Sequence, residues 1–425
     1  MVSQVISRLH TLGLSRSDLM NPEANMTSLN TNIQSALSGL PTQTVQYTGT
    51  DVDDLNQFLQ NNTGKIVQLT QDIQVYKNTN GSFGIIMVPS DTILDGTGHR
   101  LVMKAGYTEA PDVGVVLYVY KDGVIPSTNC GVKNLSTDIP YVNSINVFSA
   151  DNILIENNTL NNATKSGIMI SDEYGSTVNG IIRGNTINNV GDDAIAVYGN
   201  HSNLLIDSNR ISGAKGFAGI AISCLQNGQQ IRVDNETTGP HDIIVTGNVI
   251  SGCSGEALYC IGSYKTYITY NTLRDSILEG VCLDSGCIGN YFAHNEVVNN
   301  GIAGGLPGVS IDNGIYNIVD SNNIYNNSCS GIKLVRTGLG NIIVNNICTD
   351  NAYNQMGAKS SGIDIEPLAV ETENLGYIDG LGSNWNVVLN NTVTGSHDFG
   401  VFIADDDTAN NGGSSCENVI MYNKF

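Results

Sequence analysis

Gly280-Val-Cys-Leu-Asp284 is the first of four segments that share one pattern. The other three are Gly308-Val-Ser-Ile-Asp312, Gly331-Ile-Lys-Leu-Val335 and Gly362-Ile-Asp-Ile-Glu366. Each starts with glycine and continues as an alternating strand, so its second and fourth residues point to one face and its third and fifth to the other. The second and fourth residues are all aliphatic, which predicts a repeated strand with an apolar inner face. The outer face would carry Asp284, Asp312, Lys333, Asp364 and Glu366.

The same kind of strand recurs from about residue 142 to residue 404 and alternates with a recurrent asparagine. Most steps between these asparagines are about 23 to 27 residues long. Short strands, Asn- and Gly-rich turns and a period in the low twenties are typical of a parallel β-helix, whereas a propeller blade needs about 40 residues. Stacked asparagine amides can bond from coil to coil, so we expect an internal ladder. Its predicted members are Asn158, Asn185, Asn209, Asn248, Asn271, Asn295, Asn322, Asn345, Asn391 and Asn423.

The N-terminal region has a different character. Apolar spacing predicts a helix over residues 27–40, and an acidic start predicts a second helix over residues 51–60. We expect residues 1–62 to form a helical segment that plugs the first coil, and residues 63–425 to form the β-helix. Two coils have extra residues, 225–240 and 367–385, which we expect to form loops beside the charged face. An exposed last coil needs a cover, which another subunit, another domain or a loop of the chain itself would supply. A homo-oligomer such as a trimer is one such assembly.

Composition excludes several classes of protein. The chain has 425 residues and a net charge of -21, which argues against a nucleic-acid partner. Its nine cysteines are odd in number and form no CxxC pair, which predicts free buried thiols and no structural zinc site. The sequence has neither a signal-peptide pattern nor an apolar run of about 20 residues. We therefore expect no membrane partner, and a place in the cytoplasm or on a phage particle rather than secretion.

The outer face is the candidate site. Neighbouring coils lie about 4.8 Å apart, so Asp284 and Asp312 should be adjacent, with Glu366 two coils beyond Asp312 and Lys333 between them. Like charges at this spacing raise the pKa of one carboxyl, which marks the group as a functional candidate. A plainer interpretation is that these are exposed acids neutralised by Lys333 and Arg336. We predict three catalytic residues: Asp284, Asp312 and Glu366. The predicted substrate-binding residues are Lys333, Arg336, Asp364, Tyr259 and Trp385, and weaker catalytic candidates at strand entries are Glu256 and Glu279.

Two carboxyl groups are the usual catalytic residues of glycoside hydrolysis. Carboxyl groups about 5 to 5.5 Å apart predict retention of configuration, and about 6.5 to 9.5 Å predicts inversion; the sequence leaves both open. We predict a hydrolase acting on an oligo- or polysaccharide with no cofactor or metal. One alternative is a Ca²⁺-dependent lyase or C5-epimerase with Lys333 or Arg336 as base. Another is a non-catalytic glycan-binding fibre or tailspike.

Gly191-Asp-Asp193 lies at the entry to a strand and resembles the segment that supplies catalytic acids in β-helix polygalacturonases. This resemblance implies catalytic roles for Asp192 and Asp193. The polygalacturonase Asn-Thr-Asp and Gly-His-Gly segments are absent, and Lys165-Ser-Gly and Gly216-Phe-Ala stand in their places. Without those partners, Gly-Asp-Asp reads as an ordinary turn.

Over most of its length, the chain resembles the pectate-lyase-like family of bacterial glycosidases and phage tailspikes. The repeat and the Gly362-Ile-Asp-Ile-Glu-Pro367 strand carry this resemblance. It implies an all-β fold, a single-stranded right-handed parallel β-helix with a short N-terminal helical cap, and a glycan as substrate or partner.

Overall fold

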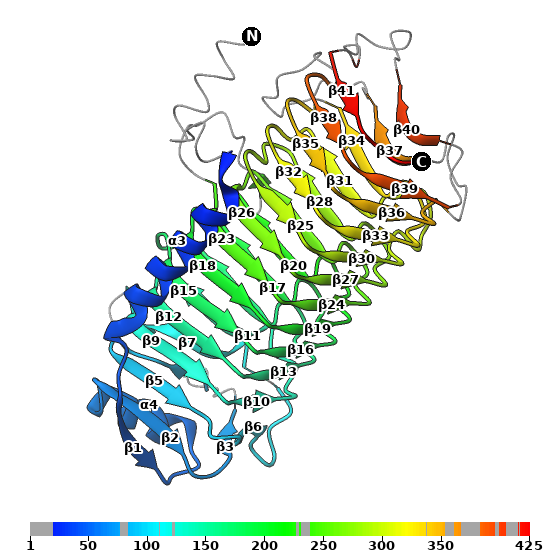
Figure 1. Ribbon diagram of the computed structural model, residues 1–425. Helices are drawn as coiled ribbons and strands as arrows, with labels where there is room; N and C mark the ends of the chain where they lie inside the picture. Colours follow the sequence, from blue (N-terminus) through cyan, green and yellow to red (C-terminus); the bar gives the residue numbers. More distant parts are fainter. Residues whose placement is uncertain are drawn as a thin grey trace. The chain divides into compact units, whose positions relative to one another are not determined.

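The computed structural model describes residues 20–76, 84–109, 111–120, 124–226, 229–230, 239–336, 338–352, 361–366, 383–395, 399–404, 415 and 417–425. The chain divides into two compact units. One comprises residues 28–221, and the other comprises residues 222–425 together with the residues up to Thr27. Each unit is a parallel β-helix built from three sheets, called A, B and C, to which successive strands contribute in turn (Figure 1). The predicted fold class is confirmed.

The unit of residues 28–221 contains the first coils. Sheet A contains β1 (Gln43–Tyr47), β2 (Lys65–Leu69), β5 (Thr92–Asp95), β9 (Thr128–Lys133), β12 (Asp151–Glu156), β15 (Val178–Arg183) and β18 (Ser202–Asp207). Sheet B contains β3 (Ile73–Val75), β6 (Arg100–Met103), β10 (Ser136–Thr137), β13 (Thr159–Asn161), β16 (Thr186–Asn188) and β19 (Arg210–Ser212). Sheet C contains β4 (Ile86–Met87), β7 (Val113–Tyr120), β11 (Asn143–Phe148), β14 (Ile168–Ser171) and β17 (Ile195–Tyr198), with β8 (Val124–Pro126) antiparallel to β7. The division between the units falls within β20 (Ile220–Ser223).

Helix α4 (Val52–Asn61) caps the first coil of this unit. The Asp51 side chain accepts a hydrogen bond from the backbone N–H of Asp53 and so caps the helix start. The apolar face of α4 is fully buried and packs against β3 and β4. The preceding 3-10 helix η1 (Leu37–Gly39) contacts β12 instead. Strand β1 precedes the predicted boundary at residue 62 and pairs with β2 in sheet A.

The C-terminal unit repeats the same architecture. Sheet A contains β23 (His241–Thr246), β26 (Tyr264–Thr269), β29 (Tyr291–Ala293), β32 (Ile318–Asp320), β35 (Ile342–Val344), β38 (Val387–Leu389) and β41 (Val419–Met421). Sheet B contains β24 (Val249–Ser251), β27 (Thr272–Arg274), β30 (Glu296–Val298), β33 (Asn323–Tyr325), β36 (Ile347–Thr349) and β39 (Thr392–Thr394). Sheet C contains β25 (Leu258–Ile261), β28 (Val281–Asp284), β31 (Val309–Asp312), β34 (Ile332–Val335), β37 (Ser361–Ile365) and β40 (Phe399–Ile403). A small antiparallel pair joins β21 (Leu225–Gln226) to β22 (Gln229–Gln230).

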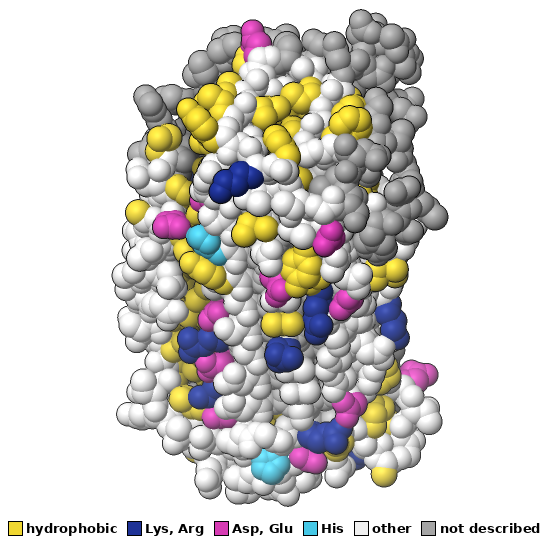
Figure 2. All heavy atoms as spheres, turned by 45° about the vertical axis from the view of Figure 1, so that its right-hand side comes forward, with side chains coloured by type: hydrophobic (Ala, Val, Ile, Leu, Met, Phe, Trp, Pro, Cys, Tyr) yellow, Lys and Arg dark blue, Asp and Glu magenta, His cyan; other side chains and the backbone are white. Residues whose placement is uncertain are grey.

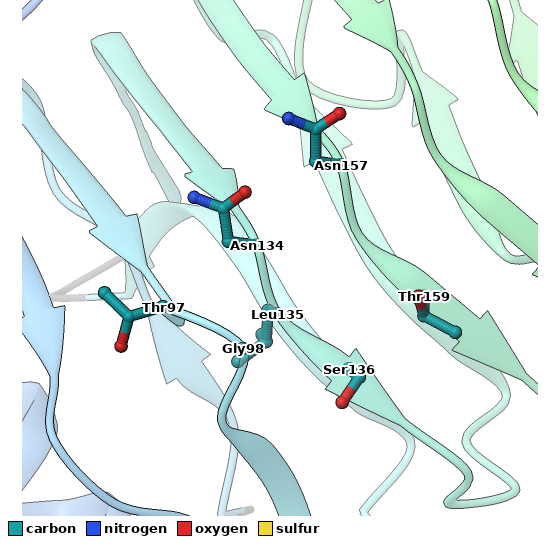
Figure 3. A pocket seen from close by; sticks show the side chains of 7 residues that line it. All are labelled: Thr97, Gly98, Asn134, Leu135, Ser136, Asn157 and Thr159. Carbon is teal, nitrogen blue, oxygen red and sulfur yellow. The ribbon is translucent and has the colours of Figure 1, made fainter.

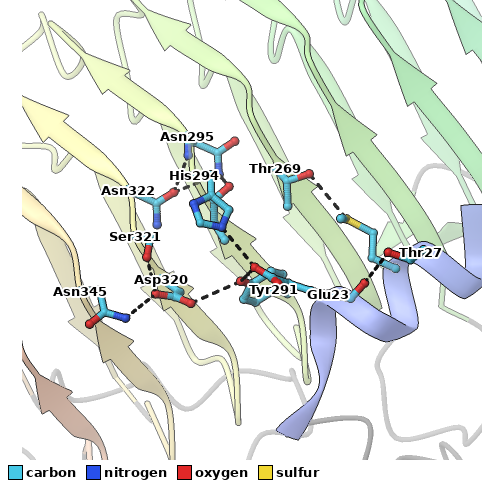
Figure 4. Close-up of polar contacts among 12 residues, drawn as sticks. Glu23, Thr27, Thr269, Tyr291, His294, Asn295, Asp320, Ser321, Asn322 and Asn345 are labelled. Carbon is cyan, nitrogen blue, oxygen red and sulfur yellow. Dashed lines mark hydrogen bonds and ion pairs between the residues drawn. The ribbon is translucent and has the colours of Figure 1, made fainter.

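Helix α3 (Pro22–Ala36) begins earlier than the sequence predicts, because Pro22 is well suited to a first helical position. Its first turns belong to the C-terminal unit and lie against sheet A (Figure 4). Glu23 Oε1 accepts a hydrogen bond from the Tyr291 hydroxyl at 3.4 Å and lies 3.3 Å from His294 Nε2. The Thr269 hydroxyl donates to the sulfur of Met26. Polar contacts therefore hold the helix start on the sheet.

Asparagine ladders run inside both units, as the sequence predicts. In each step the side-chain oxygen accepts hydrogen bonds from the backbone N–H and the amide of the asparagine one coil before. One ladder joins Asn158, Asn185 and Asn209, and another joins Asn248, Asn271, Asn295, Asn322, Asn346, Asn391 and Asn423. The prediction of Asn345 was wrong by one residue. Asn345 lies in a turn with φ of 59°, because the inward residue of the following strand is the buried Cys348 and not the half-exposed Ile347.

The sequence analysis missed two further ladders. They join Asn290, Asn317, Asn341, Asn386 and Asn418, and Asn300, Asn327 and Asn351. All three ladders of the C-terminal unit satisfy backbone groups at turns that would otherwise be buried without partners.

The inner faces of the sheet C strands form an apolar core. Val281, Leu283, Ile332 and Leu334 are completely buried, which confirms the predicted alternation. The eight described cysteines form no disulfide with one another, and all but Cys329 are buried. Within the described residues, no helix is long and apolar enough to span a membrane.

Apolar side chains are exposed near the end of the chain. Figure 2 shows hydrophobic side chains gathered toward the top of its view. The exposed large apolar residues in the last described strands and tail include Val419, Met421, Tyr422 and Phe425. The predicted cover for the last coil stays a prediction.

Candidate active site

The outer face of sheet C in the C-terminal unit brings most of the predicted site residues together. The pairing register stacks Tyr259, Cys282, Ser310, Lys333, Asp364 and Phe402 in one row. Asp284 and Asp312 lie two positions further along neighbouring strands β28 and β31, and Glu366 directly follows β37. We call Glu256, Glu279, Asp284, Asp312, Asp364 and Glu366 the acid cluster.

Asp312 forms an ion pair with Arg336, and its pKa is nevertheless raised. Arg336 Nη1 donates to Asp312 Oδ2 at 2.8 Å, and the Asp312 side chain is 20% exposed. Burial, and next the negative charge of Asp284, raise the pKa of Asp312 to about 6 although Arg336 and Lys333 oppose the rise. The other oxygen, Oδ1, is buried and makes no hydrogen bond among the described residues. Asp312 can therefore carry a proton near neutral pH.

A second group of charges surrounds Lys333. Its Nζ lies 2.8 Å from Glu366 Oε2 and 3.8 Å from Asp364 Oδ2. Asp364 is almost completely buried, and burial followed by the charge of Glu366 raises its pKa to about 7. Burial alone would lower the pKa of Lys333, but its contacts with Glu366 and Asp364 outweigh burial and raise that pKa, so Lys333 stays charged.

The remaining acids extend the cluster toward β25. The Tyr259 hydroxyl donates to Asp284 Oδ2 at 2.7 Å, and the backbone N–H and hydroxyl of Ser285 donate to Asp284 Oδ1. Burial raises the pKa of Glu279 to about 7, and the charges of Glu256, Asp312 and Asp284 add to that rise. Burial likewise raises the pKa of Glu256, and its Oε2 makes no hydrogen bond among the described residues. Both oxygens of Asp284 are thus engaged, whereas Glu256 is a buried acid with unused hydrogen-bonding capacity.

The acids of the polygalacturonase-like segment lie in the other unit. Asp193 is completely buried and accepts hydrogen bonds from the backbone N–H of Ala218 and from the Tyr198 hydroxyl. These contacts fix the turn before β17 and leave the carboxylate inaccessible to solvent. Asp192 is half-buried, and its backbone N–H bonds to the carbonyl of Lys165.

Trp385 is 42% exposed, and its indole N–H donates to Glu417. Ser383, which the sequence analysis did not select, reaches the site instead. Its hydroxyl contacts the backbone carbonyls of Arg336 and Glu366 at 3.1 and 3.2 Å. Of the predicted loops, residues 227–228, 231–238 and 367–382 lie outside the described residues.

Ser330 is another residue that sequence reasoning missed, and its hydroxyl donates to Asp364 Oδ2 at 3.4 Å. The signal was its position directly before the glycine of a sheet C strand.

Among the described residues, no group of three or more His, Cys, Asp or Glu side chains is arranged to hold a metal ion.

A hollow of about 550 Å³ lies in the unit of residues 28–221 (Figure 3). Its lining is polar but carries no ionisable side chain, so it cannot perform acid–base chemistry. The lining residues are Thr97, Gly98, Asn134, Leu135, Ser136, Asn157 and Thr159. This hollow therefore does not compete with the acid cluster as the candidate for catalysis.

Comparison with known proteins shows the fold. The family model described as "Right handed beta helix region" matches residues 125–238. The A-module of the Azotobacter vinelandii mannuronan C-5 epimerase AlgE6 is 12% identical, with a TM-score of 0.54 over 88% of this chain and 99% of that one. The Streptococcus pneumoniae surface adhesin PfbA is 13% identical, with a TM-score of 0.51 over 75% of this chain and 92% of that one. No match was found among curated proteins. The predicted resemblance to right-handed parallel β-helix proteins is confirmed.

Proposed function

We propose that the protein hydrolyses a glycosidic bond and that the acid cluster is its active site. The observation that carries the proposal is that one sheet face holds a carboxyl with a raised pKa and a second carboxyl that is ion-paired with a lysine. Asp312 has a pKa raised to about 6, while Glu366 is paired with a charged lysine. Glycoside hydrolysis needs one carboxyl that donates a proton to the leaving oxygen and one carboxylate that attacks carbon or activates water.

In this proposal Asp312 is the general acid and Glu366 is the carboxylate. Both side chains are about one-fifth exposed, so both can meet a substrate. Asp364 is too deeply buried for that contact and instead tunes the charge of Glu366 and Lys333. The backbones of β31 and β37 are two strand spacings apart, roughly 10 Å.

The lyase and epimerase alternatives need a base that is neutral before it removes a sugar proton. Lys333 is kept charged by Glu366 and Asp364, and a guanidinium such as that of Arg336 does not lose its proton in proteins. The tyrosine in the cluster, Tyr259, has its pKa raised by burial and by Asp284, which makes it a poor base. These charges favour hydrolysis over proton abstraction.

The carbohydrate class rests on the shared fold as well as on the acids. One protein of this fold is named for an activity on mannuronan, a polysaccharide. An extended face built from stacked strands also suits a linear chain of sugars. The negative charge of the acid cluster favours a neutral glycan over a uronate.

The test uses a glycan panel to find a substrate, followed by three single variants. Asp312→Asn and Glu366→Gln are each expected to lower kcat by about 10² to 10⁴, as the loss of a general acid or of the attacking carboxylate would. Asp275→Asn is the matched control, because Asp275 is a partly exposed acid beside sheet B of the same unit. Full activity in both Asp312→Asn and Glu366→Gln, with folding verified by circular dichroism, would refute the proposed site.

A further inference from the structure

Asp284 and Asp312 lie beside each other on neighbouring strands of sheet C in the C-terminal unit. Each is the last residue of its strand, β28 and β31 respectively. The register pairs Leu283 with Ile311, so the two aspartates that follow continue the same alignment. Neighbouring strands of a sheet are about 4.8 Å apart. A negative charge on Asp284 therefore acts on Asp312 at short range.

Hydrogen bonds fix the Asp284 carboxylate in place. The Tyr259 hydroxyl donates to its Oδ2 at 2.7 Å, and the backbone N–H and hydroxyl of Ser285 donate to its Oδ1 at 2.6 and 2.5 Å. Hydrogen bonds to a charged acceptor are shorter and stronger than those between neutral groups. The three donors thus orient both oxygens of Asp284 and stabilise its negative charge.

The charge of Asp284 acts on three acids around it. Burial is the largest cause that raises the pKa of Glu256, the pKa of Glu279 to about 7 and the pKa of Asp312 to about 6. The negative charge of Asp284 adds to the rise in each case. Glu256 and Glu279 hold protons more readily than exposed acids do, so each is a less constant source of negative charge. Asp284 is the carboxylate that acts on all three.

Two cations face Asp312 from the opposite side. Lys333 lies on β34, the strand on the other side of β31, and Arg336 directly follows that strand. Arg336 Nη1 donates to Asp312 Oδ2 at 2.8 Å. The charges of Arg336 and Lys333 both lower the pKa of Asp312, against the larger effects of burial and of Asp284. Without the charge of Asp284, Asp312 would lose its proton at a lower pH.

We infer that Asp284 is a positioning residue that keeps a proton on Asp312 until that proton passes to the glycosidic oxygen. The inference rests on the proposed function, because the proton serves hydrolysis only if Asp312 is the general acid. It gives Asp284 an electrostatic role that acts through Asp312, in place of the direct catalytic role that the sequence predicts. Asp312 and Glu366 then meet the substrate, and Asp284 supplies a fixed charge beside the acid.

The first measurement follows the Asp312 carboxyl itself and needs no substrate. The full chain is labelled with ¹³C at the aspartate carboxyl carbons, and the Asp312 resonance is the one missing from Asp312→Asn. We expect this resonance to titrate with a midpoint near pH 6 in wild type and about one pH unit lower in Asp284→Asn. Asp275→Asn is the matched control, because it removes one negative charge beside sheet B of the same unit and should leave the midpoint unchanged.

The second measurement is the pH–rate profile on a substrate from the glycan panel. Loss of the Asp312 proton sets the alkaline limb. A midpoint about one unit lower makes the rate of Asp284→Asn fall from about one-half of the wild-type rate at pH 5 to about one-tenth at pH 7. A merely structural defect would lower the rate by the same factor at every pH. Asp284→Glu keeps the negative charge and should return the alkaline limb toward its wild-type position.

The two measurements separate this inference from the proposed function. An Asp312 midpoint that is unchanged or higher in Asp284→Asn, with folding verified by circular dichroism, overturns the inference whatever the rates. A lower midpoint together with an alkaline limb moved to lower pH supports both. A lower midpoint with an unmoved limb supports the effect of Asp284 on Asp312 and refutes Asp312 as the general acid, which is a failure of the proposed function alone.

Discussion

Asp364→Asn should stabilise the protein, and more so as the pH rises. The folded protein raises the pKa of Asp364 from 3.8 to about 7, so between those values the folded state binds a proton that the unfolded state does not. Stability from this group is complete at low pH and is lost as the pH rises toward 7. One pKa unit corresponds to about 1.4 kcal/mol, and the folded group is half-deprotonated at pH 7, so wild type should lose about 2 kcal/mol relative to Asp364→Asn between pH 5 and pH 7. The difference should stay constant above about pH 8.

The assay is urea-induced unfolding, followed by circular dichroism at pH 5, 6, 7 and 8 for both proteins. Lys333 keeps its contact with Glu366 in the variant, so no new unpaired cation confuses the comparison. Glu173→Gln serves as control, since Glu173 is an exposed acid whose loss should leave the pH dependence as in wild type. If the stability difference between Asp364→Asn and wild type does not change with pH, or shrinks as pH rises, the burial and charge repulsion assigned to Asp364 are wrong.

Three further predictions test the scaffold and the site. Asn295→Ala should lower the unfolding free energy by about 3 kcal/mol in urea unfolding, because it leaves buried backbone groups of adjacent coils without partners. Asn345→Gly, at an exposed turn, is its control and should cost less than about 0.5 kcal/mol in the same assay. Leu334→Ala should cost about 2 to 5 kcal/mol, since the side chain is completely buried in the core; a cost below 1 kcal/mol by urea unfolding would contradict the packing. Arg336→Gln should raise the pKa of Asp312 further, so the alkaline limb of the pH–rate profile should move to higher pH, and movement to lower pH would exclude Asp312 as the acid.

The sequence predicts the coils well because a solenoid repeats one local rule. Alternation in segments such as Gly331-Ile-Lys-Leu-Val335 reports burial directly, since every inward residue meets the same core. The ladder error at Asn345 shows the limit of that rule. Asn345 and Asn346 are adjacent, and either could be the recurrent asparagine of its coil. Only the burial of Cys348 and the exposure of Ile347 distinguish them. The path of α3 was not predictable either, because Glu23 contacts Tyr291 and His294 across more than 260 residues of sequence.

The sequence predicts which residues lie together in the site better than it predicts why their pKa values are raised. Strand register alone places Lys333 beside Asp364. Repulsion between like charges was the expected cause of raised pKa values, yet burial is the largest cause for Asp312, Asp364 and Glu279. Alternation cannot reveal this burial, because it reports which face a side chain points to and not what covers that face.

The glycan panel, assayed with and without EDTA, tests the central claim most directly. New reducing ends and the absorbance of unsaturated uronate products are recorded from the same reactions. The account predicts reducing ends without that absorbance, unchanged by EDTA and reduced about 10² to 10⁴ in Asp312→Asn. Absorbance that EDTA abolishes would instead identify a metal-dependent lyase and contradict the assignment of Asp312 and Glu366 as the acid and carboxylate of a hydrolase.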